Sequence, residues 1–465
     1  MKRSMALLVV AALGVHSVPV LAQGARRAPQ APARPPHASS AGIAGVPSDA
    51  GPVLALSLTQ ALALALNNNL AYRQAAADER VAQARLVQAA STRLPSLSAG
   101  YAYTHTQNSA SFTFPVPTAN GLRSESFPFS ATDTNSVDAA LQYALFTGGA
   151  AQANIGAAAA GVAAAQSQRS ASRATVVRDT INAYFQLVQA QRAAVIAQQA
   201  AALAQQNETL ARQLYSAGVA AKADVLRQDL SLANARLAAI QARNGAALAN
   251  AALANLLNVG LGSRITATEP LEGSVPSYEL APLLSGAQLR RPEIAAARYA
   301  VAVAQSAVRA ARAGYLPSVS LSIQDASVKP NFVNLPQPQL SETLAATWRL
   351  FDGGLTKGKV QEAAAQADKA GLSLQQLGNG VDLEVRQAYS NLAAAQSALD
   401  VARAAQTSAA ENLRVSRIRF RAGAGTSLEL ADALLSDTGA RTQYVNAQAN
   451  LRAALANLQR AAGLL

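Results

Sequence analysis

Two acidic residues in the last tenth of the sequence, Glu429 and Asp432, lie three positions apart. On a helix this spacing places both carboxylates on one face, where together they attract cations and repel anions. A structural interpretation is also open, because a helix dipole favours negative charge near its N-terminus. This pair is one candidate for a functional site.

Other motifs that could do chemistry are incomplete. The segment GGLTKGKV at 353–360 matches the G-x4-G-K part of a phosphate-binding loop, but Val360 stands where a hydroxyl would bind Mg²⁺. The histidines, His16, His37 and His105, are not spaced like metal ligands, and no Ser/His/Asp arrangement can be argued. We therefore expect no enzyme activity, no cofactor and no metal site.

The beginning of the chain predicts export. Residues 1–22 have a basic start, an apolar stretch and a small-x-small ending, typical of a signal peptide; an uncleaved membrane anchor is the alternative. Residues 23–54 are rich in Pro and Ala and predict a flexible linker.

The absence of cysteine excludes disulfides, thiolate metal sites and lipidation at cysteine. The formal net charge of +13 comes from scattered residues, so we expect no nucleic-acid binding.

The rest of the chain contains one plan twice. A Leu-Pro-Ser phrase recurs after 222 positions, whereas an aromatic-x-Gly-Gly motif and a glycine turn each recur after 205. Such a period indicates a duplicated structural unit. The 17 extra residues of the first copy fall between Leu-Pro-Ser and Gly-Gly, and their Pro, Ser and Gly content predicts a loop.

Four segments alternate apolar and polar residues and predict strands: 96–104, 136–146, 318–324 and 343–350. Strands of this length can span a bilayer when tilted; half-buried strands of a soluble sandwich are the alternative. No other segment predicts a strand, and no stretch of about 18 uninterrupted apolar residues follows the signal peptide.

Long proline-free segments predict helices for the remainder, with about 100 Å of helix between 149 and 214. One apolar series recurs at coiled-coil spacing: Leu226, Leu230, Ala233, Leu237 and Ile240. We expect a first repeat at 55–258 (β-hairpin 94–147, helical hairpin 148–258), a connector at 259–286, and a second repeat at 287–465 (β-hairpin 316–351, helical hairpin 352–465).

Prolines and glycines mark the predicted joints between helix and strand. Pro95 and Pro317 would end a helix before each strand. The glycine pairs would relieve crowding where a strand gives way to a helix; they are Gly148, Gly149, Gly353 and Gly354. Because open strand edges are not tolerated in lipid, several chains would have to pool their strands, and three chains would supply twelve.

Taken together, the signal peptide, the two Leu-Pro-Ser joints, the two Gly-Gly motifs and the two glycine turns resemble the TolC-like outer-membrane efflux family over about residues 55–463. The resemblance implies a mostly α, α+β membrane protein, with a trimeric twelve-stranded β-barrel continued by an α-helical coiled-coil barrel. It implies a location in the Gram-negative outer membrane, with the helical part in the periplasm. The implied partners are outer-membrane lipid, a periplasmic adaptor (membrane fusion protein) and an inner-membrane pump of the RND, ABC or MFS type.

The resemblance also assigns site residues. It places Glu429, Asp432 and Asp224 at the periplasmic aperture. It places adaptor docking at the two glycine turns: Gly218, Val219, Ala220, Ala221, Gly423, Ala424, Gly425 and Thr426. A simple left-handed turn that closes a helical hairpin is the structural alternative. Phe420 and Gly425 replace a tyrosine and an arginine that tether the closed entrance in well-known members, which puts that tether in doubt here.

The expected function is a passive outer-membrane conduit for drugs and small molecules, or for secreted protein as in type I secretion. A periplasmic coiled-coil adaptor or structural protein, with the predicted strands in a soluble β-domain, is the alternative. The sequence does not decide the cargo.

Overall fold

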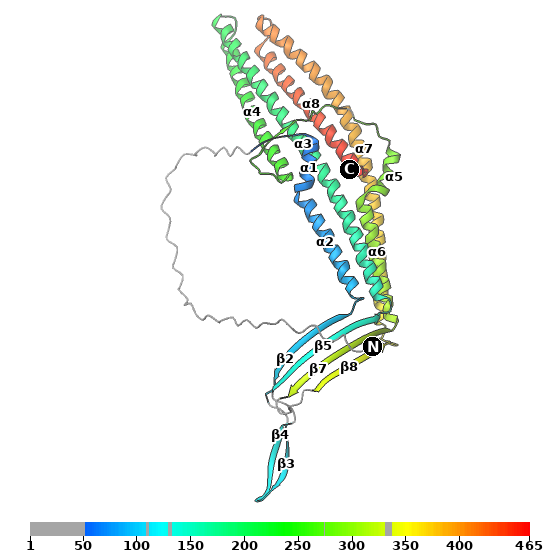
Figure 1. The fold of residues 1–465 in the computed structure, drawn as a ribbon. Helices are drawn as coiled ribbons and strands as arrows, with labels where there is room; N and C mark the ends of the chain where they lie inside the picture. The colour runs from blue at the N-terminus through cyan, green and yellow to red at the C-terminus, as the bar shows by residue number, and fades with distance from the viewer. Residues whose placement is uncertain (1–51, 108–110, 129–132, 274, 331–336) are drawn as a thin grey trace, which may run out of the picture. The chain divides into compact units, whose positions relative to one another are not determined.

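The computed structural model describes residues 52–107, 111–128, 133–273, 275–330 and 337–465. The predicted signal peptide and the linker up to residue 51 lie outside the described residues. Figure 1 shows long helices joined to a curved sheet. The same order of helices and strands occurs twice along the chain.

Two long antiparallel helical hairpins dominate the fold. The first joins α3 (Ala150–Ser216) to α4 (Lys222–Leu256), and the second joins α7 (Leu355–Arg421) to α8 (Ser427–Ala461). α3 and α7 each have 67 residues and α4 and α8 each have 35, so the two hairpins have helices of equal length. α3 is thus about 100 Å long. No helix in the described part of the chain has both the length and the apolar composition needed to cross a membrane.

Shorter helices pack beside the two hairpins. α2 (Leu70–Ser91) packs along α3, and α6 (Pro292–Arg312) packs against both α3 and α7. α1 (Leu58–Asn68) and α5 (Leu280–Arg290) precede them in each repeat. α1 begins with a capping box between Ser57 and Gln60, and Asn69 caps α2 by accepting hydrogen bonds from two backbone N–H groups.

Four antiparallel strands form the sheet, in the order β2 (Ser96–His105), β5 (Asp133–Phe146), β7 (Ser318–Pro330) and β8 (Gln337–Thr347). The central pair, β5 and β7, comes from different repeats. The strand predicted at 343–350 extends too far, because β8 ends at Thr347. The next residue, Trp348, instead donates its indole N–H to the Tyr315 carbonyl at 3.1 Å.

The 17-residue insertion forms a β-hairpin rather than the predicted loop. β3 (Ser111–Thr118) pairs with β4 (Gly121–Pro128) across a two-residue turn. In an antiparallel hairpin, hydrogen-bonded and non-hydrogen-bonded residue pairs alternate, beginning with a hydrogen-bonded pair beside the turn, here Thr118 and Gly121. Pro115 and Pro117 fall in non-hydrogen-bonded pairs, where no N–H donor is needed. The prolines that indicated a loop are therefore compatible with a strand.

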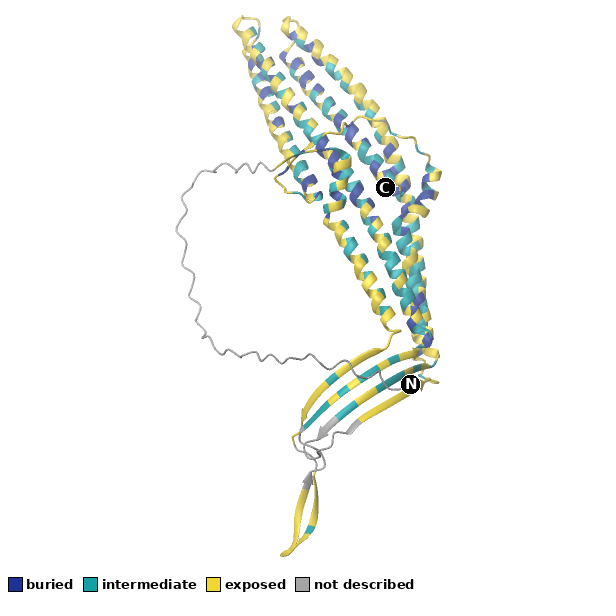
Figure 2. Cartoon of the chain, viewed as in Figure 1, coloured by how far each residue is buried: buried dark blue, intermediate teal, exposed yellow. Residues whose placement is uncertain are grey.

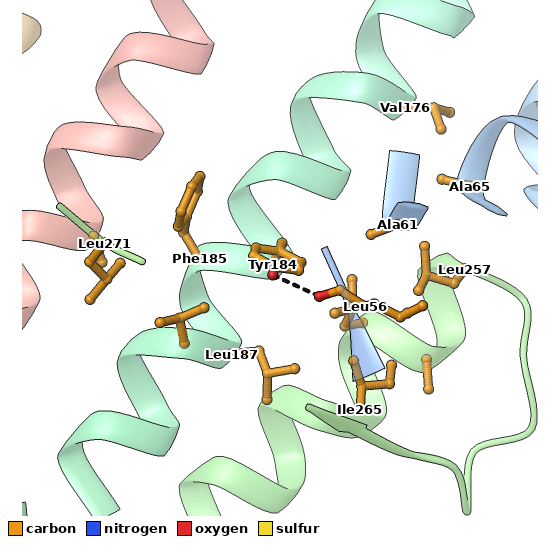
Figure 3. Close-up of a cluster of buried hydrophobic side chains, with 14 of the residues drawn as sticks. Leu56, Ala61, Ala65, Val176, Tyr184, Phe185, Leu187, Leu257, Ile265 and Leu271 are labelled. Atoms are coloured by element: carbon orange, nitrogen blue, oxygen red, sulfur yellow. Dashed lines mark hydrogen bonds between the residues drawn. The ribbon is translucent and has the colours of Figure 1, made fainter. Parts of the chain in front are cut away.

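Two further strands correct the expectation that everything else is helical. β1 (Val53–Leu56) pairs in parallel with β6 (Arg264–Ala267). Figure 3 shows the core around them, where the fully buried Tyr184 hydroxyl donates to the Leu56 carbonyl at 2.9 Å. The same hydroxyl accepts from the N–H groups of Thr268 and Glu269, both at 3.0 Å. One α3 side chain therefore joins the start of the first repeat to the connector.

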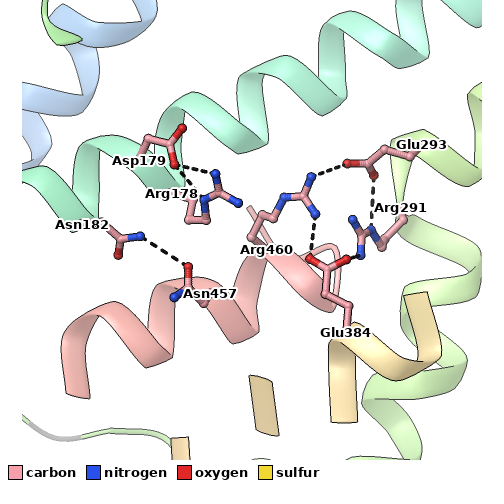
Figure 4. A network of polar contacts seen from close by, with 8 residues as sticks. All are labelled: Arg178, Asp179, Asn182, Arg291, Glu293, Glu384, Asn457 and Arg460. Carbon is pink, nitrogen blue, oxygen red and sulfur yellow. Dashed lines mark hydrogen bonds and ion pairs between the residues drawn. The ribbon is translucent and has the colours of Figure 1, made fainter. Parts of the chain in front are cut away.

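An ionic cluster joins the second repeat's helices (Figure 4). Each of two arginines, Arg291 and Arg460, contacts both Glu293 and Glu384; we call these four residues the Arg–Glu cluster. Arg291, between α5 and α6, is 4% exposed. Burial opposes the charged form of Glu293, but contacts with Arg291 and Arg460 outweigh it and lower its pKa.

Candidate functional site

The joints between helix and strand have the same backbone conformation in both repeats. Pro95 and Pro317 directly precede β2 and β7. Gly148 and Gly149 have φ of 63° and 91°, and Gly353 and Gly354 have φ of 64° and 91°. Only glycine adopts two successive left-handed conformations at little cost.

Crowding explains only one of these glycines, contrary to the expectation from sequence. A Cβ on Gly148 would lie 2.6 Å from the Ala313 carbonyl oxygen, whereas at the other three positions it would meet no atom within 4 Å. The turn from strand into helix, rather than close packing, therefore requires Gly149, Gly353 and Gly354.

The register of the sheet gathers the apolar residues on one face. Leu97 pairs with Leu141, which pairs with Ile323, and Tyr143 and Leu344 both pair with Leu321. Residues of this face are widely exposed in the single chain, with Leu97 at 77% and Leu344 at 68%. Asp325 and Glu342 interrupt it, and Ser, Thr and Gln predominate on the opposite face. The sheet therefore presents a mainly apolar surface that the described part of the chain does not cover.

The two glycine turns form matching helix ends. Gly218 and Gly423 have φ of 76° and 72°. In each turn the next residue, Val219 or Ala424, donates its N–H back to the helix, to Leu214 or Arg419, at 2.9 Å. These are Schellman motifs, which glycine favours. The structure thus contains the left-handed turn that was the structural alternative, while adaptor docking at these residues stays a prediction.

The tips of the two helical hairpins lie close together. A Cβ built on Gly423 would lie 3.7 Å from a methyl carbon of Val219. A Cβ on Gly425 would lie 3.1 Å from both the Phe420 backbone nitrogen and the Arg419 Cβ, so a larger residue there would force the turn to move. Phe420 is buried in the apolar core below the tips.

The three predicted aperture carboxylates have different surroundings. Asp432 is exposed, and no ion pair to it is found within the described ranges. Glu429 lies 3.6 Å from the Arg419 guanidinium in an exposed pair. Asp224 caps α4 by accepting from the Ala221 N–H at 3.1 Å, and it also accepts from Ser427 of the other hairpin. Glu429 and Asp432 both lie in α8. That they share one face of this helix, and that all three carboxylates line an aperture, stay predictions.

The predicted coiled-coil series does not pack within the chain. We call Leu226, Leu230, Ala233, Leu237 and Ile240 the α4 stripe. Its four large residues are 54–65% exposed, because α4 buries the adjacent face, which contains Val225, Gln228, Leu232 and Ala239 (Figure 2). The stripe is thus an apolar helix surface without a partner in one copy.

The phosphate-loop resemblance has a structural explanation. The N–H groups of Gly354 and Thr356, at the start of α7, donate to the Asp352 carboxylate at 3.0 and 2.8 Å. Contacts with Thr356 hold the pKa of Asp352 below its ordinary value. The carboxylate occupies the place that a phosphate would need. Over the described residues no group of three or more His, Cys, Asp or Glu could hold a metal ion.

Sequence reasoning missed the contacts that join the tips, although it named Asp224 as a candidate aperture residue. The side chains of Asp224, Arg227 and Gln228 on α4 all contact Ser427, the first residue of α8. No local pattern indicates this, because the partners are about 200 positions apart.

Comparisons with known proteins agree with this architecture. A family model described as outer membrane efflux protein matches residues 61–259 and 283–464. Protein CyaE of Bordetella pertussis is 28% identical over 330 residues, which is 70% of each chain. The Campylobacter jejuni CmeC outer membrane channel superposes with a TM-score of 0.74 at 17% identity, covering 87% of this chain and 85% of the other. The Neisseria gonorrhoeae MtrE outer membrane channel gives 0.70 at 20% identity, covering 88% and 89%.

The duplicated strand and helix hairpins are therefore the fold of outer-membrane channels. Since the family model covers most of both repeats, the chain belongs to the outer membrane efflux protein family. It is a TolC-like outer-membrane efflux protein.

We expect Gly423→Val to impair export. Valine in the left-handed region costs roughly 1–2 kcal/mol, enough to distort the turn without unfolding the long helices. Resistance or secretion at matched protein levels would measure the effect. Gly439→Val is the control, because Gly439 lies in α8 and a Cβ there meets open space. Full export by Gly423→Val would contradict a role for this tip in docking.

Proposed function

We propose that three copies of this chain form the outer-membrane channel of a tripartite exporter, with the helical part in the periplasm. The channel does no chemistry; it conducts cargo that an inner-membrane pump delivers through a periplasmic adaptor. The observation that carries this proposal is the apolar face of a four-stranded sheet whose two end strands each pair with one neighbour among the described strands.

Ring closure follows from the direction of these strands. β2 and β8 are the two ends of the sheet and run in opposite directions, so β8 of one copy can pair antiparallel with β2 of the next. Two different edges that meet head to tail generate a closed ring when the rotation between successive copies closes. Closure removes every open edge, as a lipid environment requires, and three copies give the twelve strands of an aqueous lumen.

The α4 stripe supports the same assembly. Its leucines and isoleucine would be buried if α4 of one copy packed beside a helix of the next. α7 also has exposed apolar residues, including Val401 at 70% and Ile418 at 54%. If the helices of neighbouring copies packed side by side, they would cover both the α4 stripe and the exposed apolar residues of α7.

The site residues take their roles from this assembly. We propose that Glu429 and Asp432, with Asp224 nearby, surround the periplasmic aperture and that the turns at Gly218–Ala221 and Gly423–Thr426 dock the adaptor. The exposure of Asp432 and of Val219, at 64%, supports these roles. The cargo, drug or protein, follows from the pump that the channel serves.

The test is the state of the purified protein. We expect a detergent-dependent trimer that forms ion-conducting channels in planar bilayers. Membranes washed with carbonate should retain the protein, whereas a periplasmic adaptor or structural protein would be released. A water-soluble monomer that forms no channels would contradict the proposal.

A further inference from the structure

Four positively charged side chains lie where the helices of the second repeat meet the sheet. α6 ends shortly before β7 and α7 begins shortly after β8 (Figure 1). The four residues, which we call the joint cations, are Arg309 and Arg312 in the last turn of α6 and Lys357 and Lys359 at the start of α7. The two lysines belong to the GGLTKGKV segment, whose phosphate-binding place at the helix start is occupied by Asp352.

The two helix ends that contain the joint cations lie against each other. A Cβ built on Gly314, just after α6, would lie 3.1 Å from the side chain of Thr356 in α7. Thr356 is buried, whereas the four joint cations are exposed. Because a helix rises about 1.5 Å per residue, all four residues lie within about 6 Å of a helix end. They therefore form one positively charged patch at the joint.

The chain does not balance the charge of this patch. Arg309 donates to the Ser306 hydroxyl at 2.8 Å, and within the described ranges no carboxylate forms an ion pair with any joint cation. The acidic residues nearest in sequence are engaged elsewhere. Asp352 accepts from Thr356, and Glu362 accepts from a glutamine one turn further along α7.

The first repeat lacks these charges at the equivalent positions. The offset of 222 applies before the sheet and the offset of 205 applies after it. The corresponding first-repeat residues are Val87, Ala90, Gln152 and Asn154. The cation nearest to the first joint, Arg93, instead aligns with Tyr315. Both joints have the same left-handed glycine pair, so the turn from strand to helix does not need the joint cations.

Side chains change character in a definite order between the sheet and the joint cations. Leu344 lies on the apolar face of β8, and Trp348, Leu350 and Phe351 follow the strand at 60%, 79% and 88% exposure. The lysines of α7 come next. Apolar, aromatic and then charged is the order expected across a lipid–water interface. The headgroup layer is roughly 5–7 Å thick, which matches the extent of the patch along the helices.

We propose that the joint cations bind the phosphate groups of anionic phospholipids in the periplasmic leaflet of the outer membrane. This rests on the proposed channel function, in which the sheet spans that membrane. The phosphates supply the negative charge that the chain does not, and the acyl chains cover Trp348 and Phe351. One such patch in each copy would fix the depth of the barrel in the bilayer.

The first test gives the second joint the residues of the first. Lys357→Gln combined with Lys359→Asn should fold, because the first joint makes the same turn with Gln152 and Asn154. Each cation near an anionic lipid surface strengthens binding about five-fold, so the double variant should bind phosphatidylglycerol about twenty-five-fold more weakly. Native mass spectrometry of the protein in mixed micelles measures this, with phosphatidylcholine as the neutral lipid.

Two controls separate a lipid site from a general effect of charge. Lys369→Gln removes an exposed lysine of α7 that lies about 15 Å further from the sheet, and it should leave the affinity unchanged. Lys357→Arg combined with Lys359→Arg keeps both charges and should retain binding. Inorganic phosphate should not displace the lipid, because it has no acyl chains to pack beside the aromatic residues.

The remaining outcomes decide against the inference. Equal binding of the two lipids, or equal affinity of the unmodified protein and the Lys357→Gln, Lys359→Asn variant, would overturn the lipid site while a detergent-dependent trimer would leave the proposed function intact. A water-soluble monomer that binds neither lipid would overturn both. Should the lysine variant not assemble, Arg309→Gln combined with Arg312→Gln decides by the same measurement. If both variants fail to form trimers in lipid-free detergent, the cations contact a neighbouring copy instead, and the inference is wrong.

Discussion

Replacing Arg291 by leucine is expected to destabilise the protein by about 3 kcal/mol, because the carboxylates of Glu293 and Glu384 would then share the single charge of Arg460. Arg291 is 4% exposed and contacts both Glu293 and Glu384. The figure lies at the lower end of the range for buried pairs, since the Glu384 side chain is 41% exposed. Thermal unfolding followed by circular dichroism in detergent measures it.

The matched control is Arg414→Leu. Arg414 also pairs with a glutamate, Glu411, but both side chains are about 60% exposed at 61% and 58%, so little change is expected. Equal midpoints for the two variants would show that the Arg–Glu cluster does not join the helices.

The pH dependence gives the cluster a second signature. The folded pKa of Glu293 is lower than its ordinary value of 4.5, so its contribution to stability is present above that value and is lost as the pH falls through the folded pKa. Arg291→Leu should therefore differ most from the unmodified protein near neutral pH and less in strong acid. A difference that stays constant down to low pH would argue against this origin.

Replacing Asp432 by asparagine is expected to remove more cation selectivity than replacing Glu429 by glutamine. Asp432 is exposed, whereas the charge of Glu429 is partly balanced by Arg419 at 3.6 Å. In the proposed trimer three copies of each carboxylate would surround one axis, and the double variant should lose most of the selectivity. Reversal potentials under a KCl gradient measure it, and block by multivalent cations should weaken in parallel.

Asp138→Asn provides the control for this experiment. Asp138 lies on the polar face of β5, where a wide water-filled lumen would weaken its effect on ions. Unchanged selectivity in the Glu429 and Asp432 double variant would mean that these residues face away from the conducting path.

The long helices and the sheet were predictable because their signals are local and repeated. Proline-free segments indicated the helices, and the period-two pattern indicated four strands whose apolar residues share a face. β1 and β6 were not predicted, because four residues are too few to show a period and the partners are more than 200 positions apart. The β3–β4 hairpin was missed because its prolines indicated a loop. Pro115 and Pro117 lie at strand positions that need no N–H donor, so they do not prevent strand pairing.

The candidate site was predictable only where one residue type determines the backbone. Gly218 and Gly423 indicated the tips because a Schellman motif needs a left-handed residue. The α4 stripe was recognised as a coiled-coil series, but its spacing could not say whether the partner belongs to the same chain. The contacts of Asp224 with Ser427 depend on how two hairpins meet, which no local pattern encodes.

The equal lengths of the corresponding helices bear on how such a channel evolves. Because α3 has the length of α7 and α4 has the length of α8, the two halves of one polypeptide can occupy equivalent positions around a ring. This is the arrangement expected if the gene of an ancestral subunit had been duplicated and fused. Fusion lets the two positions diverge. The β3–β4 hairpin belongs to the first half, and Asp432 of the second half stands where the first half has Arg227, whereas Glu429 has an acidic counterpart in Asp224. In a trimer of fused halves, the β3–β4 hairpin would therefore occur at every second position of the ring, and Arg227 and Asp432 would alternate, an arrangement that six identical subunits could not provide.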